Sequence, residues 1–321
     1  MSKSKLTFGQ KLLFYWVLWT FRLIAIWPDF ILFGVFKWII YGLVYHVVGY
    51  RVKVVRDNLT KCFPEKTTEE LRAIERGFYE NFAEIIICVL NLTVVSRAKL
   101  SSKLSIKQGA EQFVTDPRHA IIMMGHCGCW EYLPAFPTAV YNFRNVCVYH
   151  ELENPAMDEL MKYIRTRMGG VPVERREVLR HFIANKNGYP DGGRMLWGML
   201  SDQTPPKDPK HHWIKFLGRP TVFSRGSEFM AIKFGVPVYF LNVNRVGAGQ
   251  YEYSLDMIYD GREEVAEYEI TERYAQHLEQ QIRRAPELWL WSHRRWKRHF
   301  SDVAKELYYE RYPEDRPTTV Q

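Results

Sequence analysis

His126 and Glu131 are the residues of this sequence whose types and spacing best suit acid–base chemistry. In one regular helix of about 3.6 residues per turn their side chains would point about 140° apart, so they can meet only if Cys127-Gly128-Cys129 forms a turn. A carboxylate that accepts a hydrogen bond from one imidazole nitrogen leaves the other nitrogen free to remove a proton. The spacing predicts a histidine base oriented by Glu131, with the nucleophile supplied by the substrate.

The two cysteines beside His126 suggest two alternative sites. Cys127 or Cys129 next to a histidine would suit a nucleophile, as in a thioesterase-like hydrolase. His126 with both thiols could bind a metal, but Cys-x-Cys leaves the fourth ligand unassigned, so we expect none. The five cysteines of the chain are odd in number and form no CxxC pair, which favours a reducing compartment.

The elements that must position these residues alternate along residues 104–260. The apolar run Ala120–Met124 reads as a buried strand that ends at Gly125, directly before His126. Further strands are expected at Val146–Tyr149, Met195–Leu200, Val238–Val243 and Tyr253–Met257, and helices at 154–168, 175–186, 224–234 and 269–284. Strands separated by helices predict an α/β fold with a mostly parallel central sheet flanked by helices, and crevices at the strand ends.

The N-terminal segment predicts a membrane anchor. Residues 12–50 are mostly apolar and rich in Trp and Tyr, and Pro28-Asp29 divides them into two pieces. Residues 1–61 carry nine Lys or Arg against two Asp, which suits an anionic membrane surface better than nucleic acid. We expect either one tilted span or two interfacial helices; the alternative is a pair of ordinary buried core helices.

These observations predict three regions: an anchor or interfacial helices at 1–55, a catalytic domain at 56–305 and a polar tail at 306–321. A helix is expected from a cap near Thr67 to about Val89, because Thr67-Thr68-Glu69-Glu70 supplies a capping residue and first-turn acid.

The chain resembles the glycerolipid and lysophospholipid acyltransferase superfamily, whose first motif is His, four residues, then Asp or Glu. It looks closest to the lipid A biosynthesis branch, the lauroyl and myristoyl acyltransferases. Passages similar to that branch follow in order over roughly residues 10–300: Arg56-Asp57-Asn58-Leu59 with Cys62-Phe63-Pro64, Asn154–Gly169, Leu200–Gln203, Phe216–Pro220, Gly235–Val238 and Trp291–Lys297. The chain departs from the branch at Cys129, where Asn is common, and at the Thr-Pro-Pro-Lys that follows Gln203.

The resemblance implies a membrane-associated O-acyltransferase on the cytoplasmic face of a bacterial inner membrane. It would move a fatty acyl chain from an acyl carrier protein thioester, or less readily from acyl-CoA, to a hydroxyl of a lipid A precursor, without a cofactor. Its acceptor could also be a lysophospholipid, an amino-acid lipid or a glycolipid.

The resemblance also implies roles for particular residues. His126 would be the base and Glu131 its orienting partner. Arg165, with Arg167 as an alternative, would hold a phosphate, and Asp202 and Gln203 would support the base or the acceptor. The same two arginines would otherwise be read as a solvated helix face. A C-terminal basic cluster could meet the carrier protein or lipid phosphates, or be a solvated face: Arg294, Arg295, Lys297 and Arg298.

Overall fold

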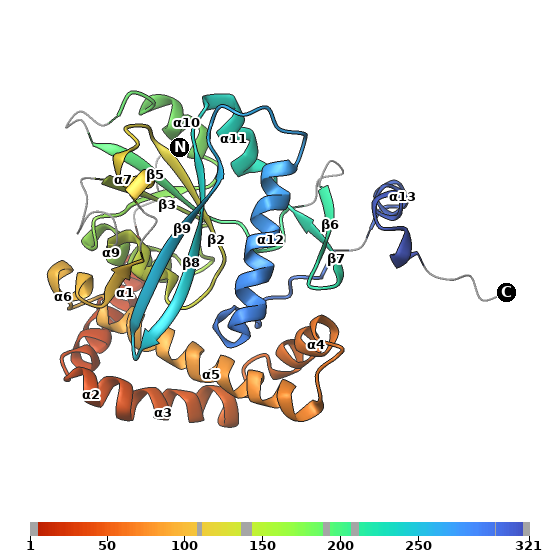
Figure 1. The fold of residues 1–321 in the computed structure, drawn as a ribbon. Helices are drawn as coiled ribbons and strands as arrows, with labels where there is room; N and C mark the ends of the chain where they lie inside the picture. Colours follow the sequence, from red (N-terminus) through yellow and green to blue (C-terminus); the bar gives the residue numbers. More distant parts are fainter. Residues whose placement is uncertain are drawn as a thin grey trace.

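A computed structural model of the chain describes residues 6–107, 111–135, 143–188, 193–206, 212–298 and 300–316. Its centre is a seven-stranded sheet in the order β1-β9-β8-β2-β5-β3-β4. Every pair of neighbours is parallel except β8 and β9, which are antiparallel. The predicted fold class, a mostly parallel sheet flanked by helices, is confirmed (Figure 1).

The strands at the centre of this sheet are largely apolar, as expected where helices and loops cover both faces. Their bounds are β1 Leu104–Ile106, β2 Ala120–Met124, β3 Phe143–Tyr149, β4 Val171–Glu174, β5 Arg194–Leu200, β8 Val238–Gly247 and β9 Gln250–Tyr259. All five residues of β2 are buried. The five predicted strands are present, while β1 and β4 were not predicted. The hairpin of β6 His212–Phe216 and β7 Arg219–Phe223 forms a separate two-stranded sheet, also unpredicted.

The helices between residues 52 and 311 connect and cover these strands. Their bounds are α4 Val52–Cys62, α5 Thr68–Asn91, α6 Arg97–Ser101, α7 Glu111–Thr115, α9 Pro155–Arg167, α10 Val178–Ala184, α11 Gly226–Phe234, α12 Glu269–Arg284 and α13 Asp302–Arg311. Short 3-10 turns lie at η3 Trp130–Ala135, η4 Pro286–Leu288 and η5 Pro313–Asp315. Thr67 and Glu70 form a capping box at the start of α5, as the sequence predicts.

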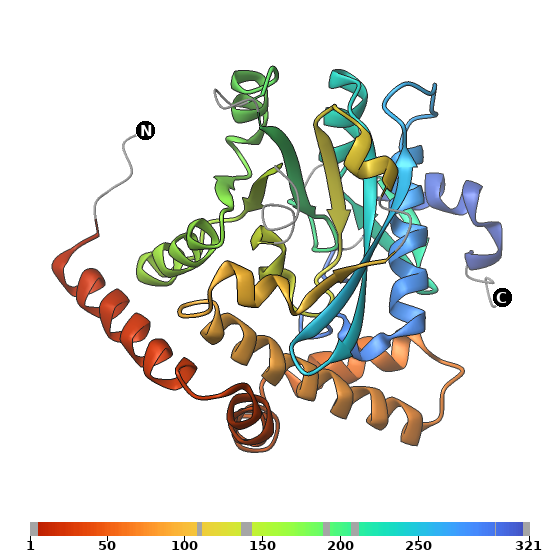
Figure 2. The same ribbon diagram turned by 60° about the vertical axis from the view of Figure 1, so that its left-hand side comes forward.

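Residues 8–47 are mostly helical and lie along one side of the molecule (Figures 1 and 2). They comprise α1 Phe8–Ala25, α2 Asp29–Ile31, α3 Lys37–Tyr41 and the π-helical turns η1 Leu32–Phe36 and η2 Gly42–Val47. The stretch Asp29–Val47 is the one helix in the described part of the chain that is long and apolar enough to cross a membrane. Large apolar side chains such as Trp16, Trp19 and Ile39 are exposed along this segment, unlike those of a buried core helix.

Polar contacts tie the N-terminal helices to the rest of the chain. The guanidinium of Arg22 donates to the Tyr163 hydroxyl on α9 at 2.6 Å, and Lys103 pairs with Asp29 at 3.0 Å. The predicted division at residues 55 and 305 stays a prediction, and residues 317–321 of the predicted tail lie outside the described structure.

Candidate active site

The candidate site lies where two neighbouring parallel strands end. β2 pairs with β5 in a register that sets Met124 beside Leu200, so the residues that follow both strands meet at one edge of the sheet. The backbone N–H of Ser201 donates to the Met124 carbonyl at 3.2 Å, which extends the pairing into the loops. His126 therefore comes next to Asp202, as expected for side chains at the carboxyl ends of parallel strands.

Asp202 binds the imidazole of His126. Its Oδ1 lies 2.6 Å from His126 Nδ1, while its Oδ2 accepts the backbone N–H of His126 at 2.9 Å and the indole N–H of Trp289 at 2.8 Å. Burial alone would raise the pKa of Asp202, but the contacts from His126 and Trp289 outweigh it and lower that pKa to about 2. An ionised Asp202 keeps the proton on Nδ1 and leaves a lone pair on Nε2.

The second nitrogen of His126 faces Gln203 and Trp130. The Gln203 amide nitrogen lies 3.2 Å from His126 Nε2, and because an amide nitrogen can only donate, Nε2 is the acceptor of this hydrogen bond. The Trp130 indole packs against the imidazole edge-on, with ring centroids 4.8 Å apart. The sequence-predicted residues His126, Asp202 and Gln203 are thus brought together, and His126 Nε2 faces the exposed side chain of Gln203.

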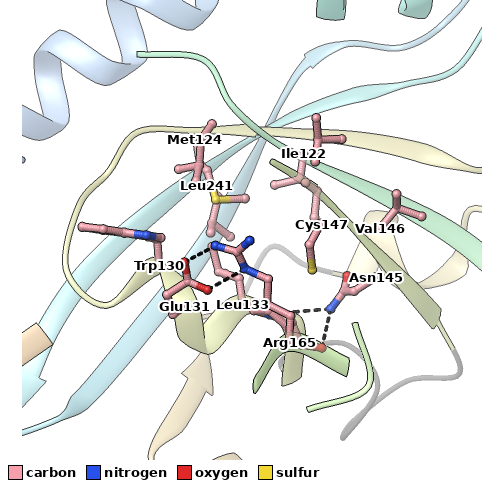
Figure 3. Close-up of a pocket in the computed structure, with 14 residues that line it drawn as sticks. Ile122, Met124, Trp130, Glu131, Leu133, Asn145, Val146, Cys147, Arg165 and Leu241 are labelled. Carbon is pink, nitrogen blue, oxygen red and sulfur yellow. Dashed lines mark hydrogen bonds and ion pairs between the residues drawn. The ribbon is translucent and has the colours of Figure 1, made fainter. Parts of the chain in front are cut away.

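The predicted contact between Glu131 and the imidazole is replaced by a different ion pair. Both Glu131 oxygens accept from Arg165, at 2.9 Å from Nε and 2.5 Å from Nη2 (Figure 3). The Cys127–Cys129 segment does turn, with a positive φ at Gly128, but the turn leads Glu131 into η3 and toward α9. The carboxylate beside the imidazole is therefore that of Asp202, which follows the neighbouring strand β5, and a role of Glu131 in catalysis stays a prediction.

The two arginines proposed for a phosphate already have protein partners. Burial would lower the pKa of Arg165, but Glu131 outweighs it and raises that pKa. Arg167 donates to three carbonyl groups in the loop after α5, at 2.6 to 3.0 Å: Leu92, Val94 and Val95. Arg165 thus pairs with Glu131, whereas Arg167 holds the loop after α5. Binding of a phosphate by either arginine stays a prediction.

The cysteines beside His126 are poorly placed for nucleophilic chemistry. Cys127 and Cys129 are each only 1% exposed, and burial raises the pKa of both thiols, so neither forms a thiolate readily. The described residues hold no group of three or more His, Cys, Asp or Glu that could bind a metal ion. The geometry thus favours the histidine over the cysteine alternative.

A segment from the C-terminal part of the chain supports the Asp202 loop. His293 Nε2 accepts the backbone N–H of Thr204 at 3.2 Å, and the Thr204 hydroxyl donates to the Arg295 carbonyl at 2.8 Å. Burial lowers the pKa of His293 to about 4, so it stays neutral and able to accept. In the sequence, only the similarity of Trp291–Lys297 to the C-terminal passage of the acyltransferase branch pointed to this segment. That similarity does not indicate that the segment contacts the Asp202 loop.

The C-terminal basic cluster is divided by the structure. Arg295 is only 1% exposed, donates to the Val222 carbonyl at 2.6 Å and lies over the Phe223 ring. It therefore cannot meet a carrier protein or lipid phosphates, whereas Arg294 is exposed.

An apolar cavity of about 60 Å³ lies against the sheet, with Trp130, Glu131 and Arg165 among its lining residues (Figure 3). It lies over β2, β3 and β5 under η3, and Trp130 lines it as well as contacting His126. The Glu131–Arg165 pair forms part of its wall.

Comparison with known proteins identifies the family of this chain. The family model for bacterial lipid A biosynthesis acyltransferases matches residues 2–298. A curated relative is lipid A biosynthesis acyltransferase 2 of Shigella flexneri, 25% identical over 150 residues; the match covers 46% of this chain and 45%, about half, of the relative's length.

A solved structure with similarity to the chain is that of the 1-acyl-sn-glycerophosphate (LPA) acyltransferase PlsC from Thermotoga maritima. The match has 15% identity and a TM-score of 0.36, and covers 88% of this chain and 99% of that one. This likeness is low, and the family rests on the match over residues 2–298.

Proposed function

We propose, since the chain belongs to the bacterial lipid A biosynthesis acyltransferase family, that it transfers a fatty acyl chain from a thioester to a hydroxyl of a lipid, with His126 as the general base. The observation that carries the proposal is the 2.6 Å contact between His126 Nδ1 and buried Asp202. Asp202 takes the orienting role first given to Glu131, and the lone pair of Nε2 is left for the acceptor hydroxyl.

The reaction balances with the residues of this chain and two substrates. As the acceptor oxygen bonds to the thioester carbonyl carbon, its proton passes to His126 Nε2, and Asp202 stabilises the imidazolium that forms. The C–S bond then breaks, and the proton on Nε2 passes to the departing sulfur. An alcohol is a poor nucleophile until it loses its proton, and a positioned base typically contributes about 10²–10⁴-fold. This chemistry requires no cofactor.

We propose an acyl carrier protein as the donor partner and a lipid A precursor as the acceptor. Gln203, whose amide occupies the position beside Nε2 at 3.2 Å, would give way to the acceptor hydroxyl. Residues 8–47 expose an apolar face and lie beside the basic residues of this region. This combination favours binding to an anionic membrane surface, such as the cytoplasmic face of a bacterial inner membrane.

Product analysis of the purified protein tests this function. The protein is offered carrier-protein and CoA thioesters with a lipid A precursor, a lysophospholipid, an amino-acid lipid or a glycolipid, and products are identified by mass spectrometry. We expect transfer to the lipid A precursor from the carrier-protein thioester, and a fall of at least about 10²-fold for His126→Ala. Undiminished transfer by folded His126→Ala would refute the role of the base, and acylation of only another lipid would refute the acceptor.

A further inference from the structure

The segment Trp289–Arg295 holds Asp202 from two directions. The Trp289 indole donates to the Asp202 carboxylate at 2.8 Å, and His293 Nε2 accepts the backbone N–H of Thr204, two residues further along the chain, at 3.2 Å. Apart from an isolated bridge at Trp289, the segment contains no helix or strand. Its backbone must therefore be held by contacts other than those of regular secondary structure.

Three successive carbonyl groups of this segment accept hydrogen bonds from side chains of α4 and its N-cap. The Asn58 amide donates to the Trp291 carbonyl at 2.8 Å and to the His293 carbonyl at 3.0 Å. The Arg51 guanidinium donates to the Ser292 carbonyl at 3.0 Å. Asn58 thereby uses both N–H groups of its side chain, and the backbone on either side of Ser292 is fixed against α4.

Asn58 is buried where it contacts the segment. Only 5% of Asn58 is exposed, and the rings of Trp289 and Trp291 form a buried edge-to-face pair with centroids 4.7 Å apart. Without the amide, the Trp291 and His293 carbonyls would each lose a hydrogen bond at a site with little access to water, which favours movement of the backbone toward other donors. Because Trp289 and His293 lie in this short segment, such a movement would reach Asp202.

We propose that Asn58 is a positioning residue for acyl transfer, which acts through the segment Trp289–Arg295 to hold Asp202 against the imidazole of His126. The inference rests on the proposed function and gives a role to the passage Arg56–Leu59, for which the sequence indicated none. His126 can remove a proton through Nε2 only while Nδ1 keeps its own, so a loosened Asp202 weakens the base. Misplacement of a catalytic group by about 1 Å can cost about 10²-fold in rate.

Arg194 provides a matched control, because it makes the same kind of contact away from the catalytic edge. Its guanidinium donates to the carbonyls of Arg118, Val114 and Phe113, at 2.8, 3.2 and 3.3 Å. Arg194 is the first residue of β5, whereas Asp202 comes after the last residue of that strand. Loss of these hydrogen bonds should lower stability without loosening Asp202.

Steady-state kinetics compare wild type, Asn58→Ala, Asn58→Asp and Arg194→Ala. Asn58→Asp keeps the shape of the side chain but places an oxygen where the amide donated, so both Asn58 variants lack the two hydrogen bonds. We expect kcat to fall by about 10–10²-fold in both, with KM for each substrate little changed, because Asp202 is buried behind the base. Arg194→Ala should keep the wild-type kcat although its melting temperature falls.

The nitrogen NMR spectrum of the histidine rings reports on Asp202 without any substrate. In protein labelled with ¹⁵N-histidine, at a pH above the range in which imidazole titrates, the two ring-nitrogen shifts of His126 show which nitrogen carries the proton. Comparison with His126→Ala identifies these signals. Wild type and Arg194→Ala should show the Nδ1–H tautomer alone, and both Asn58 variants should show a mixture of the two tautomers.

The spectra separate failure of this inference from failure of the proposed function. A tautomer mixture confined to the Asn58 variants supports the positioning role. His126 signals that match wild type in both Asn58 variants overturn the role, whatever happens to kcat, and so does an equal change in Arg194→Ala. If wild type transfers no acyl chain, the proposed function fails, while the spectra still decide whether Asn58 holds Asp202. Thermal unfolding confirms that each variant is folded, and Asn58→Ala serves if Asn58→Asp does not fold.

Discussion

At the scale of single residues, Asp202 and Glu131 are the two carboxylates that could orient the imidazole of His126. The strand register brings only Asp202 beside it. Asp202 follows the strand next to β2 and reaches the imidazole, whereas Glu131 follows the turn after His126 and reaches Arg165. The carboxylate that contacts the imidazole is therefore indicated better by position at the end of a neighbouring strand than by closeness to His126 in the sequence.

The depressed pKa of Asp202 predicts a stability change in acid. Because the folded-state pKa is about 2, against 3.8 ordinarily, the ionised carboxylate contributes about 2 kcal/mol above pH 4 that is lost as the pH falls toward 2. Asp202→Asn lacks this titration. We expect the difference in unfolding free energy between wild type and Asp202→Asn to change by about that amount between pH 5 and pH 2. A difference that is constant over this range would contradict the ionised, His126-bound state.

The residues that the sequence predicted best were those whose signal is local. The run Ala120–Met124 is apolar throughout and ends at Gly125, so both the strand and the placement of His126 after it could be predicted. The contact between His126 and Asp202 spans 76 positions and depends on which strands are neighbours, which no local pattern reveals. The same holds for His293, whose role depends on a loop 89 positions away.

At the scale of elements, the turn after β2 depends on one glycine. Gly128 has a φ of +55°, and a Cβ there would lie 2.6 Å from Tyr251 Cε1 and 3.1 Å from Val243 Cγ1. The adjoining Cys127 forms an isolated bridge with Trp289, whose indole binds Asp202. The turn therefore links the histidine segment to the part of the chain that holds the carboxylate.

Gly128→Ala should disturb both stability and site geometry. Backbone strain and overpacking each cost about 1–3 kcal/mol, so we expect a clearly lower melting temperature and reduced turnover. Gly226→Ala is the matched control, because a Cβ there would lie 3.7 Å from Ser224 Oγ, an ordinary contact. A melting temperature for Gly128→Ala equal to that of the control would show that the turn tolerates a side chain.

Elements with weak or absent local patterns escaped prediction. Strands β1 and β4 span only three and four residues and lie at the two edges of the sheet. Pairing with the adjacent strand, and not a local sequence pattern, makes each of them a strand. The β6–β7 hairpin contains Pro220, which argues against a strand, yet it forms a separate pair outside the main sheet. In contrast, α12 matched its prediction of 269–284, because its apolar spacing and acidic first turn are local signals.

At the scale of the whole molecule, the exposed apolar residues gather on the N-terminal helices. Trp16 is 65% exposed and Trp19 is 57% exposed, while Arg22 of the same helix contacts α9. A helix with one apolar face toward solvent and basic residues nearby is suited to lie at a membrane surface.

Replacing Trp16 and Trp19 with Ser should weaken vesicle binding. The loss of two large apolar side chains should lower partition onto vesicles that contain anionic lipid by at least about tenfold. Phe229→Ser on α11, also an exposed aromatic residue, is the control and should leave binding unchanged. Sedimentation with vesicles gives the partition coefficient, and equal coefficients for wild type and the double variant would contradict this membrane surface.

The central claim is that Asp202 holds the imidazole of His126 so that Nε2 removes a proton from an alcohol. It is tested most directly by single-turnover acyl transfer with Asp202→Asn, a change that keeps the side-chain size but removes the charge that fixes the imidazole tautomer. We predict a fall in the rate of the chemical step by about 10³–10⁴-fold, with the fold and donor binding retained. A rate within about tenfold of wild type would contradict the account.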